Sequence, residues 1–187
     1  MEALKKESRY YTYADYCTWD DDARYELING ESYLMSPAPT TAHQEISVEL
    51  LKQLSNFLTG KPCKVFHAPV DVRLDADKAD DTVVQPDILV VCDLSKLDGK
   101  SVRGAPDFII EILSPSSYRR DLFIKLNKYM QAGVREYWVV NPEIRAVSAH
   151  ILKDGVYMIS AYGDENEAVP VHVLEGCVIN LKEIFKG

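Results

Sequence analysis

The sequence predicts an α/β fold in which helices flank a mixed sheet. Short apolar runs bounded by turn residues are typical of buried strands, and several occupy the middle of the chain. Two longer segments repeat apolar residues at helical spacing. Asn-Gly and Asp-Gly pairs between apolar runs predict β-hairpins near both ends of the chain. The predicted central order is therefore helix, three strands, helix and strand.

The chain length and composition favour one globular domain. The 187 residues, 1–187, are enough for a sizeable core, and 47% of them are hydrophobic. The start of the chain is charged and resembles no secretory signal, and no apolar run is long enough to span a membrane. Subtracting 29 acidic from 21 basic residues gives a net charge of −8, which argues against a protein that coats nucleic acid. A narrow basic cleft remains compatible with this charge.

The cysteines lie far apart and form no C-x-x-C pair. This excludes the usual zinc spacings and provides no disulfide framework, so we expect reduced thiols and a cytoplasmic location. The cysteines are Cys17, Cys63, Cys92 and Cys177.

The N-terminal third contains a short helix, a hairpin and a long helix. Thr12 is expected to cap a helix over 13–17. The hairpin pairs 24–28 with 31–35 around Asn29-Gly30, and 36–41 is a rigid connector. Thr40 or Thr41 caps a helix that runs to about residue 58, with Gly60 after its end. His43 lies at the start of the apolar stripe of this helix.

The remaining elements follow from apolar runs, turn residues and a second helical pattern. Residues 114–117 turn the chain and cap the second helix, over about 118–132, and Gly133 suits its C-terminal end. Pro142 ends the strand that follows. The predicted strands are 63–74, 83–92, 108–113, 136–141, 147–152, 156–161, 169–174 and 177–181.

Two carboxylates interrupt apolar strands in the centre of the chain. Asp87 follows Gln85-Pro86 at the start of one strand, and Glu111 shares a strand face with Ile109 and Leu113. A buried carboxylate needs a hydrogen bond, a cation or a metal. If the strands are neighbours, both acids can bind one divalent ion such as Mg²⁺, and the carbonyl of Ile112 is a further candidate ligand.

The second helix supplies a candidate catalytic cation. Leu122, Leu126 and Tyr129 form its apolar stripe, and Lys125 lies at the edge of that stripe. A lysine there can rest its stem on the core and bring its ammonium group to the metal site. It would orient an attacking water and stabilise negative charge on phosphorus.

These residues carry a family resemblance from about residue 10 to residue 142. The chain resembles the PD-(D/E)XK nuclease superfamily, and within it the Uma family of restriction-endonuclease-like proteins. The superfamily core is the same helix, three strands, helix and strand. The matching segments are Tyr25-Glu26-Leu27-Ile28-Asn29-Gly30-Glu31, Ser36-Pro37 followed by His43, Gln85-Pro86-Asp87, Glu111-Ile112-Leu113-Ser114-Pro115-Ser116, Asp121 with Lys125 and Tyr129, and Gly133-Val134-Arg135-Glu136-Tyr137-Trp138.

The resemblance implies a metal-dependent nuclease with a restriction-endonuclease-like core at about 40–142, an N-terminal helix and hairpin at 10–36, and a C-terminal β extension at 143–187. It assigns metal binding to Asp87 and Glu111. The superfamily lysine falls two residues after the second acid, where this chain has Leu113. The Uma pattern resembles proteins in which this lysine has moved to the next helix, so its role passes to Lys125. His43 is then a base or phosphate contact at the rim, and Glu31 an accessory acid.

Each of these residues also has a purely structural interpretation. Asp87 is suited to closing a turn. A buried ion pair with Arg135 or Lys125 would also account for Glu111, although an acid inside an apolar strand is harder to explain structurally. A histidine on an apolar stripe is more often a core or capping residue, which applies to His43. Asp121 suits the positive end of its helix, and Tyr129 and Trp138 suit the core.

The predicted function is therefore a Mg²⁺- or Mn²⁺-dependent endonuclease that hydrolyses DNA. RNA has the same backbone chemistry and stays open as a substrate, and a membrane partner is not expected. A catalytically inactive module that binds DNA or a protein is the alternative, because the usual strand lysine is missing. By family analogy and symmetry we expect a homodimer. Candidate phosphate contacts are Arg119, Arg120, Lys128, Lys61 and Lys64.

Overall fold

A computed structural model describes residues 9–35, 38–115, 118–162 and 167–186. The predicted connector residues Ser36 and Pro37, and Ser116 and Ser117 before the second helix, lie outside these ranges. The helical elements are α1 (Tyr13–Tyr16), α2 (Thr41–Leu58), η1 (Leu94–Lys96), η2 (Arg120–Lys125), α3 (Leu126–Ala132) and α4 (Leu181–Ile184). In this part of the chain no helix is both long and apolar enough to cross a membrane.

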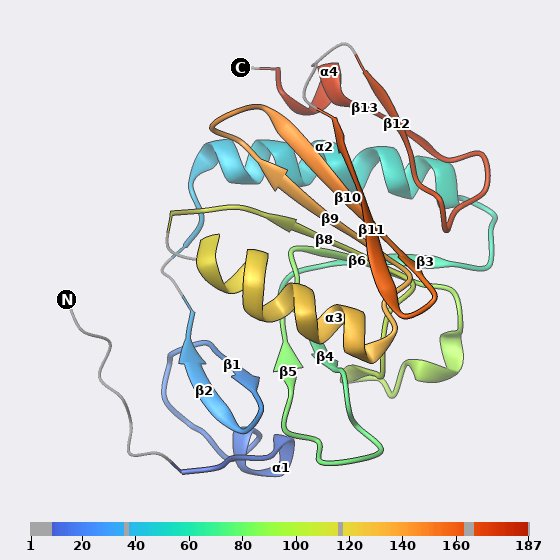
Figure 1. The fold of residues 1–187 in the computed structure, drawn as a ribbon. Coiled ribbons are helices and arrows are strands. Elements are labelled where there is room, and N and C mark those ends of the chain that lie inside the picture. Colours follow the sequence, from blue (N-terminus) through green and yellow to red (C-terminus); the bar gives the residue numbers. More distant parts are fainter. Residues whose placement is uncertain (1–8, 36–37, 116–117, 163–166, 187) are drawn as a thin grey trace.

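A mixed six-stranded sheet forms the centre of the molecule (Figure 1). Its strands lie in the order β11-β10-β9-β8-β6-β3, and β8 and β9 are the only parallel neighbours among them. The predicted order of helix, three strands, helix and strand is confirmed by α2, β3, β6, β8, α3 and β9. The bounds are β3 (Lys64–His67), β6 (Ile88–Val91), β8 (Phe108–Ile112), β9 (Glu136–Asn141), β10 (Ala146–Lys153) and β11 (Val156–Tyr162).

A second sheet was not predicted from the sequence. It has the order β2-β1-β5-β4-β7, so the N-terminal hairpin is joined to the centre of the chain through β5. A small third sheet pairs β12 with β13. The bounds are β1 (Tyr25–Ile28), β2 (Glu31–Leu34), β4 (Asp71–Arg73), β5 (Val83–Val84), β7 (Ser101–Arg103), β12 (Ala168–Pro170) and β13 (Val178–Asn180).

The six-stranded sheet is covered on both faces (Figure 1). The buried stripe of α2 packs against one face, together with α4 and the C-terminal segment. The other face packs against α3 and the second sheet. Alternation along β8 directs Ile110 to the first core and Ile109 to the second. Glu111 alternates with Ile110, so it lies on the face covered by α3 and the second sheet, as the strand pattern predicted.

Two predicted strands are each divided in the structure. The run 63–74 becomes β3 and β4, which belong to different sheets, and the run 83–92 becomes β5 and β6. The breaks fall at Pro69 and Pro86, because proline has no N–H to donate to a strand ladder. The break at Pro86 leaves Asp87 just before β6. The predicted strand 169–174 shortens to β12, and η1, β7 and α4 were missed.

The prediction that no cysteines pair is wrong for Cys63 and Cys92, which form a disulfide. These residues flank the antiparallel strands β3 and β6, in which Lys64 pairs with Val91. Because they are 29 residues apart in the sequence, their spacing did not indicate that they would be neighbours. Cys17 and Cys177 are free.

Candidate functional site

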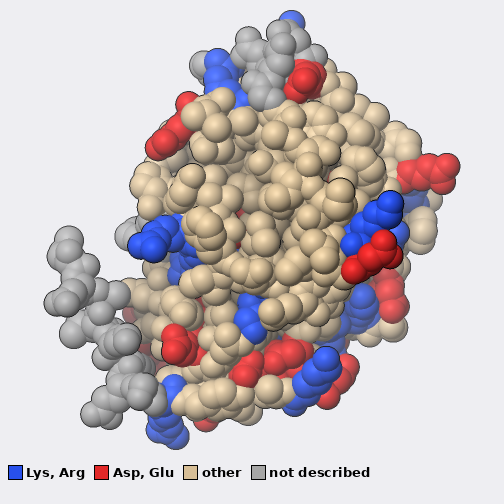
Figure 2. All heavy atoms as spheres, in the orientation of Figure 1, with Lys and Arg blue, Asp and Glu red and all other residues tan. Residues whose placement is uncertain are grey.

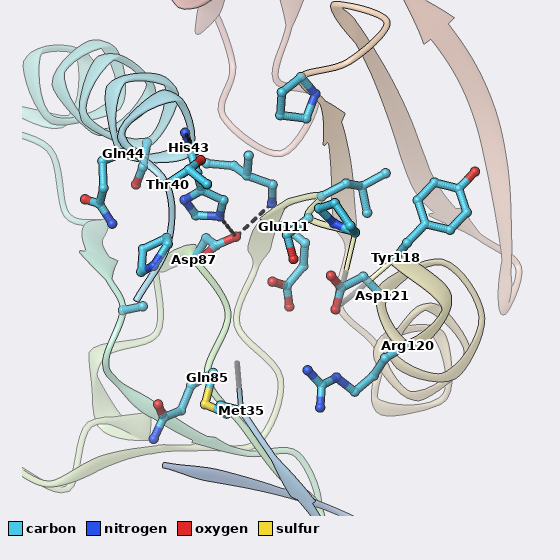
Figure 3. A pocket seen from close by; sticks show the side chains of 18 of the residues that line it. Met35, Thr40, His43, Gln44, Gln85, Asp87, Glu111, Tyr118, Arg120 and Asp121 are labelled. Atoms are coloured by element: carbon cyan, nitrogen blue, oxygen red, sulfur yellow. Dashed lines mark hydrogen bonds and ion pairs between the residues drawn. The ribbon is translucent and has the colours of Figure 1, made fainter. Parts of the chain in front are cut away.

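A pocket of about 730 Å³ opens beside the start of α2, between the six-stranded sheet and the second sheet. Its wall comes from segments that are distant in the sequence, and Figure 3 shows how they converge on Asp87 and Glu111. His43, Asp87, Glu111, Ile112 and Lys125 all line it. The structure therefore brings together every predicted site residue except Glu31.

Asp87 stands where the chain enters β6, and its carboxylate faces two neighbours (Figure 3). Its Oδ2 accepts the backbone N–H of Ile112 at 2.8 Å and lies 3.3 Å from His43 Nε2. The side chain is 22% exposed, so it remains open to the pocket. The turn-closing interpretation does not describe Asp87, because its bond links two adjacent strands of the sheet.

His43 lies in the first turn of α2. Thr40 Oγ1 accepts the backbone N–H of His43 at 3.2 Å, which is the capping bond that fixes the start of the helix. Burial of the imidazole opposes protonation, but the hydrogen bond and charge of Asp87 and a backbone bond to Ile112 outweigh it and raise the pKa of His43. Asp87 thus stabilises the protonated form of the imidazole.

Glu111 and Lys125 form a buried pair at the base of the pocket. Lys125 Nζ lies 2.9 Å from Glu111 Oε1, and the Tyr129 hydroxyl donates to the same oxygen at 2.7 Å. Lys125 is 3% exposed. The ion pair left open between Glu111 and either Arg135 or Lys125 is formed by Lys125, whereas Arg135 pairs with Asp107 at 3.2 Å.

The Lys125 ammonium group is shared by three carboxylates. It lies 2.6 Å from Glu26 Oε1 and 3.5 Å from Asp121 Oδ1, in addition to Glu111. Burial disfavours this charge, but Glu111, Glu26 and Asp121 outweigh burial and raise the pKa of Lys125 well above its usual 10.5. Burial raises the pKa of Glu111 to about 8. The charge of Lys125 opposes this increase, and the neighbouring carboxylates add to it.

Glu26 is the site residue that the sequence reasoning missed. It lies on β1, is fully buried, and accepts the backbone N–H of Gln85 at 3.0 Å. Its Oε2 lies 3.5 Å from Arg120 Nε. Glu31, predicted as the accessory acid, is exposed on β2, accepts the Tyr33 hydroxyl at 3.0 Å, and does not line the pocket. An acid within an apolar strand was the available signal for Glu26, as it was for Glu111.

The second helix differs from the prediction in its geometry and in the contacts of two of its residues. Its first part, η2, is π-helical, a form often found at functional sites. Asp121 is 2% exposed and contributes to the carboxylate cluster, rather than serving only the helix terminus. Tyr129 is buried as predicted, but its hydroxyl binds Glu111.

The predicted basic residues divide into two groups. Arg119 and Arg120 line the pocket, whereas Lys61, Lys64 and Lys128 do not. Lys128 donates to the side chain of Asn29.

The carboxylates can accommodate a hydrated divalent ion. Among the described residues, no partner contacts Asp87 Oδ1 or Glu111 Oε2, so each acid keeps one oxygen for a ligand. The same residues contain no group of three or more His, Cys, Asp or Glu arranged to hold a metal. This donor set fits Mg²⁺, which uses one or two carboxylates and retains several waters.

Comparison with known proteins places this geometry in context. The family model Uma2, described as "Putative restriction endonuclease", matches residues 12–182. A crystal structure described as a putative nuclease belonging to DUF820, from Anabaena variabilis, superposes with a TM-score of 0.75 and 18% identity, covering 94% of this chain and 97% of that one. An uncharacterized protein of Synechocystis is 24% identical over 152 residues, 79% of this chain and 78% of the relative.

Proposed function

Since the chain belongs to the Uma2 family of nuclease-like proteins, we propose that it is a metal-dependent endonuclease that hydrolyses phosphodiester bonds of DNA. Asp87 and Glu111 would hold one Mg²⁺ or Mn²⁺ ion through their remaining oxygens, with the Ile112 carbonyl as a further ligand. When bound, such an ion neutralises charge on the phosphate and lowers the pKa of its water.

Lys125 and Tyr129 hold Glu111 in position. Both donate to Glu111 Oε1, at 2.9 and 2.7 Å, which fixes the carboxylate rotamer and leaves Oε2 for a ligand. The Lys125 ammonium group would also orient a water for attack on phosphorus; as the new P–O bond forms, the bond to the leaving oxygen breaks and the proton of the attacking water passes to solvent. This assigns Lys125 the task that the superfamily usually gives to a strand lysine.

The cationic side chains at the pocket wall contact the phosphate. Asp87 raises the pKa of His43, which favours the protonated ring and with it a contact to phosphate. Arg119 and Arg120 line the pocket beside it. Glu26 acts through Lys125 and Arg120, which it holds at 2.6 and 3.5 Å, and we propose it as the accessory acid in place of Glu31.

One observation carries the proposal: a lysine from the helix after β8 reaches the strand acid at 2.9 Å, while Asp87 opens into the same pocket. Buried pairs of this kind are costly to retain for stability alone.

A non-catalytic binding module is the second candidate. This candidate is favoured by the position of the Lys125 ammonium group, which balances the charges of Glu111, Glu26 and Asp121 without a metal.

Nicking of supercoiled plasmid with Mg²⁺ or Mn²⁺ separates the two candidates. We expect nicking by the wild type and by Glu45→Gln, an exposed position on α2 outside the pocket. Glu111→Gln and Lys125→Met should abolish it. Nicking that survives in Glu111→Gln would refute the site, and loss in Glu111→Gln alone would refute the role of Lys125.

A homodimer is part of the same proposal. The outer strand β11 pairs only with β10 among the described strands. Its residues Val156, Met158 and Ile159 are 59–64% exposed. Figure 2 shows few charged residues over β10 and β11 on this face. An uncharged strand edge is suited to pairing with another chain.

A further inference from the structure

The depth of the acids restricts how a substrate reaches them. Glu111 and Lys125 are each 3% exposed, and the Asp87 side chain is 22% exposed. A reacting phosphate must therefore enter the pocket instead of resting on the protein surface. In a duplex, each phosphate is carried on a broad, stiff double helix. A single strand can bend and lead one phosphate inward.

The wall of the pocket is apolar in several places. Met35, Pro39, Leu113 and Pro142 all line it. These side chains offer nothing to a phosphate backbone, and in a duplex the faces of the bases are stacked on one another. An unpaired base presents an apolar face that such a wall can contact.

The cations near the pocket are too few for a duplex. Arg24 is bound to the Gln85 side chain at 2.5 Å, and Arg120 lies 3.5 Å from Glu26. Among the described residues, Arg119 is the only lining arginine without a side-chain partner. A duplex-binding protein can neutralise about 6–10 phosphates with Lys and Arg, whereas this chain has a net charge of −8.

Tyr118 supplies an aromatic surface at the rim. It extends from the helical segment that leads into η2, at the edge of the pocket (Figure 3). The side chain is 46% exposed, and its ring packs against no aromatic ring of the described residues. Exposed aromatic rings beside a basic residue are the usual stacking platforms for single-stranded nucleic acid.

We propose that the pocket takes an unpaired DNA strand, with one base stacked on Tyr118 and its neighbouring phosphate led past Arg119 to Asp87 and Glu111. This rests on the proposed nuclease function and narrows its substrate to single-stranded or locally melted DNA.

The test compares a labelled single-stranded oligonucleotide with a duplex of the same sequence. Binding is followed by fluorescence anisotropy in EDTA, so that cleavage does not interfere. We expect tighter binding of the single strand. Tyr118→Ala should weaken single-strand binding about 5- to 150-fold, the range for loss of one stacked base. Tyr118→Phe keeps the ring and should bind normally. Phe123→Ala removes a more exposed aromatic, at 62%, that does not line the pocket, and should also bind normally.

The outcomes separate this inference from the nuclease itself. Equal or tighter binding of the duplex, or equal effects of Tyr118→Ala and Phe123→Ala, would overturn the single-strand subsite. Cleavage of relaxed duplex with Mg²⁺, without cleavage of the single strand, would also overturn it while leaving the nuclease intact. Single-strand preference without cleavage in Mg²⁺ or Mn²⁺ would support the subsite and contradict the nuclease.

Discussion

Removing the Lys125 ammonium group should destabilise the protein strongly and in a pH-dependent way. Lys125→Met keeps most of the side-chain volume but leaves Glu26, Glu111 and Asp121 without their shared cation. These carboxylates lie 2.6, 2.9 and 3.5 Å from Nζ and are at most 3% exposed. The variant therefore buries negative charge that Arg120, 3.5 Å from Glu26, compensates only in part.

The expected loss at pH 8 is about 3–5 kcal/mol, the cost of breaking a buried ion pair from one side. A native domain is stable by about 5–15 kcal/mol, so most of the variant should still fold. The pKa of Glu111 is already raised to about 8, and loss of Lys125 raises it further. Raised carboxyl pKa values mean that the folded state binds protons more readily than the unfolded state. The penalty should therefore shrink as the pH falls from 8 to 5.

Urea unfolding of both proteins at pH 8 and pH 5 measures this difference. Lys128→Met is the matched control, because Lys128 lies on α3 of the same helical segment and outside the pocket. Mn²⁺ should recover part of the loss in Lys125→Met, since a divalent ion replaces the missing charge beside Glu111. A loss that is equal at both pH values, or no loss at all, would refute the electrostatic reasoning.

Three further predictions concern other parts of the molecule. Tyr129→Phe removes the hydroxyl that donates to Glu111 at 2.7 Å, so it should lower the free energy of unfolding by about 1–3 kcal/mol. Calorimetry should also show weaker Mn²⁺ binding, and an unchanged Mn²⁺ affinity would contradict the positioning role of Tyr129. Burial lowers the pKa of His150 from 6.5, so this residue should contribute less stability as the pH falls below 6.5, and urea unfolding should show that the wild type becomes less stable relative to His150→Leu over that range. Gly30 has φ +75° and an added Cβ would lie 2.4 Å from the Tyr10 ring, so Gly30→Ala should cost about 1–2 kcal/mol by thermal unfolding. Gly99→Ala has similar φ and open space, so an equal cost would show that the ring contact is unimportant.

The central elements were predictable because their signals are local. The apolar stripe of α2, its Thr40 cap and the alternation around Glu111 each fall within a few residues. The helical spacing also placed Lys125 next to the apolar stripe of the second helix, which is enough to direct it toward the sheet.

The second sheet was not predictable because its key pairing is not local. One register pair, Leu27 with Val83, joins β1 to β5 and brings Glu26 over Glu111 and Lys125. The apolar neighbours of Glu26 distinguish it from Glu31, but both acids flank the same Asn-Gly turn, and the local sequence does not show which strand of the hairpin is covered. Only the covering sheet decides which of the two is buried.

The same limit explains the cysteine pair. Cys63 and Cys92 are 29 residues apart, and they become neighbours only when β3 pairs with β6. Spacing rules for cysteines describe short motifs and small disulfide frameworks, and this pair is neither.

Calorimetric titration of Mn²⁺ into the wild type, Asp87→Asn and Glu45→Gln tests the proposed metal site most directly. Asp87→Asn can still accept the Ile112 N–H, which lies 2.8 Å from Oδ2, so the fold should persist while a charged ligand is lost. We predict one bound ion in the wild type and in Glu45→Gln, and much weaker binding in Asp87→Asn. Binding of equal strength in all three proteins, or no binding in the wild type, would contradict a metal site at Asp87 and Glu111.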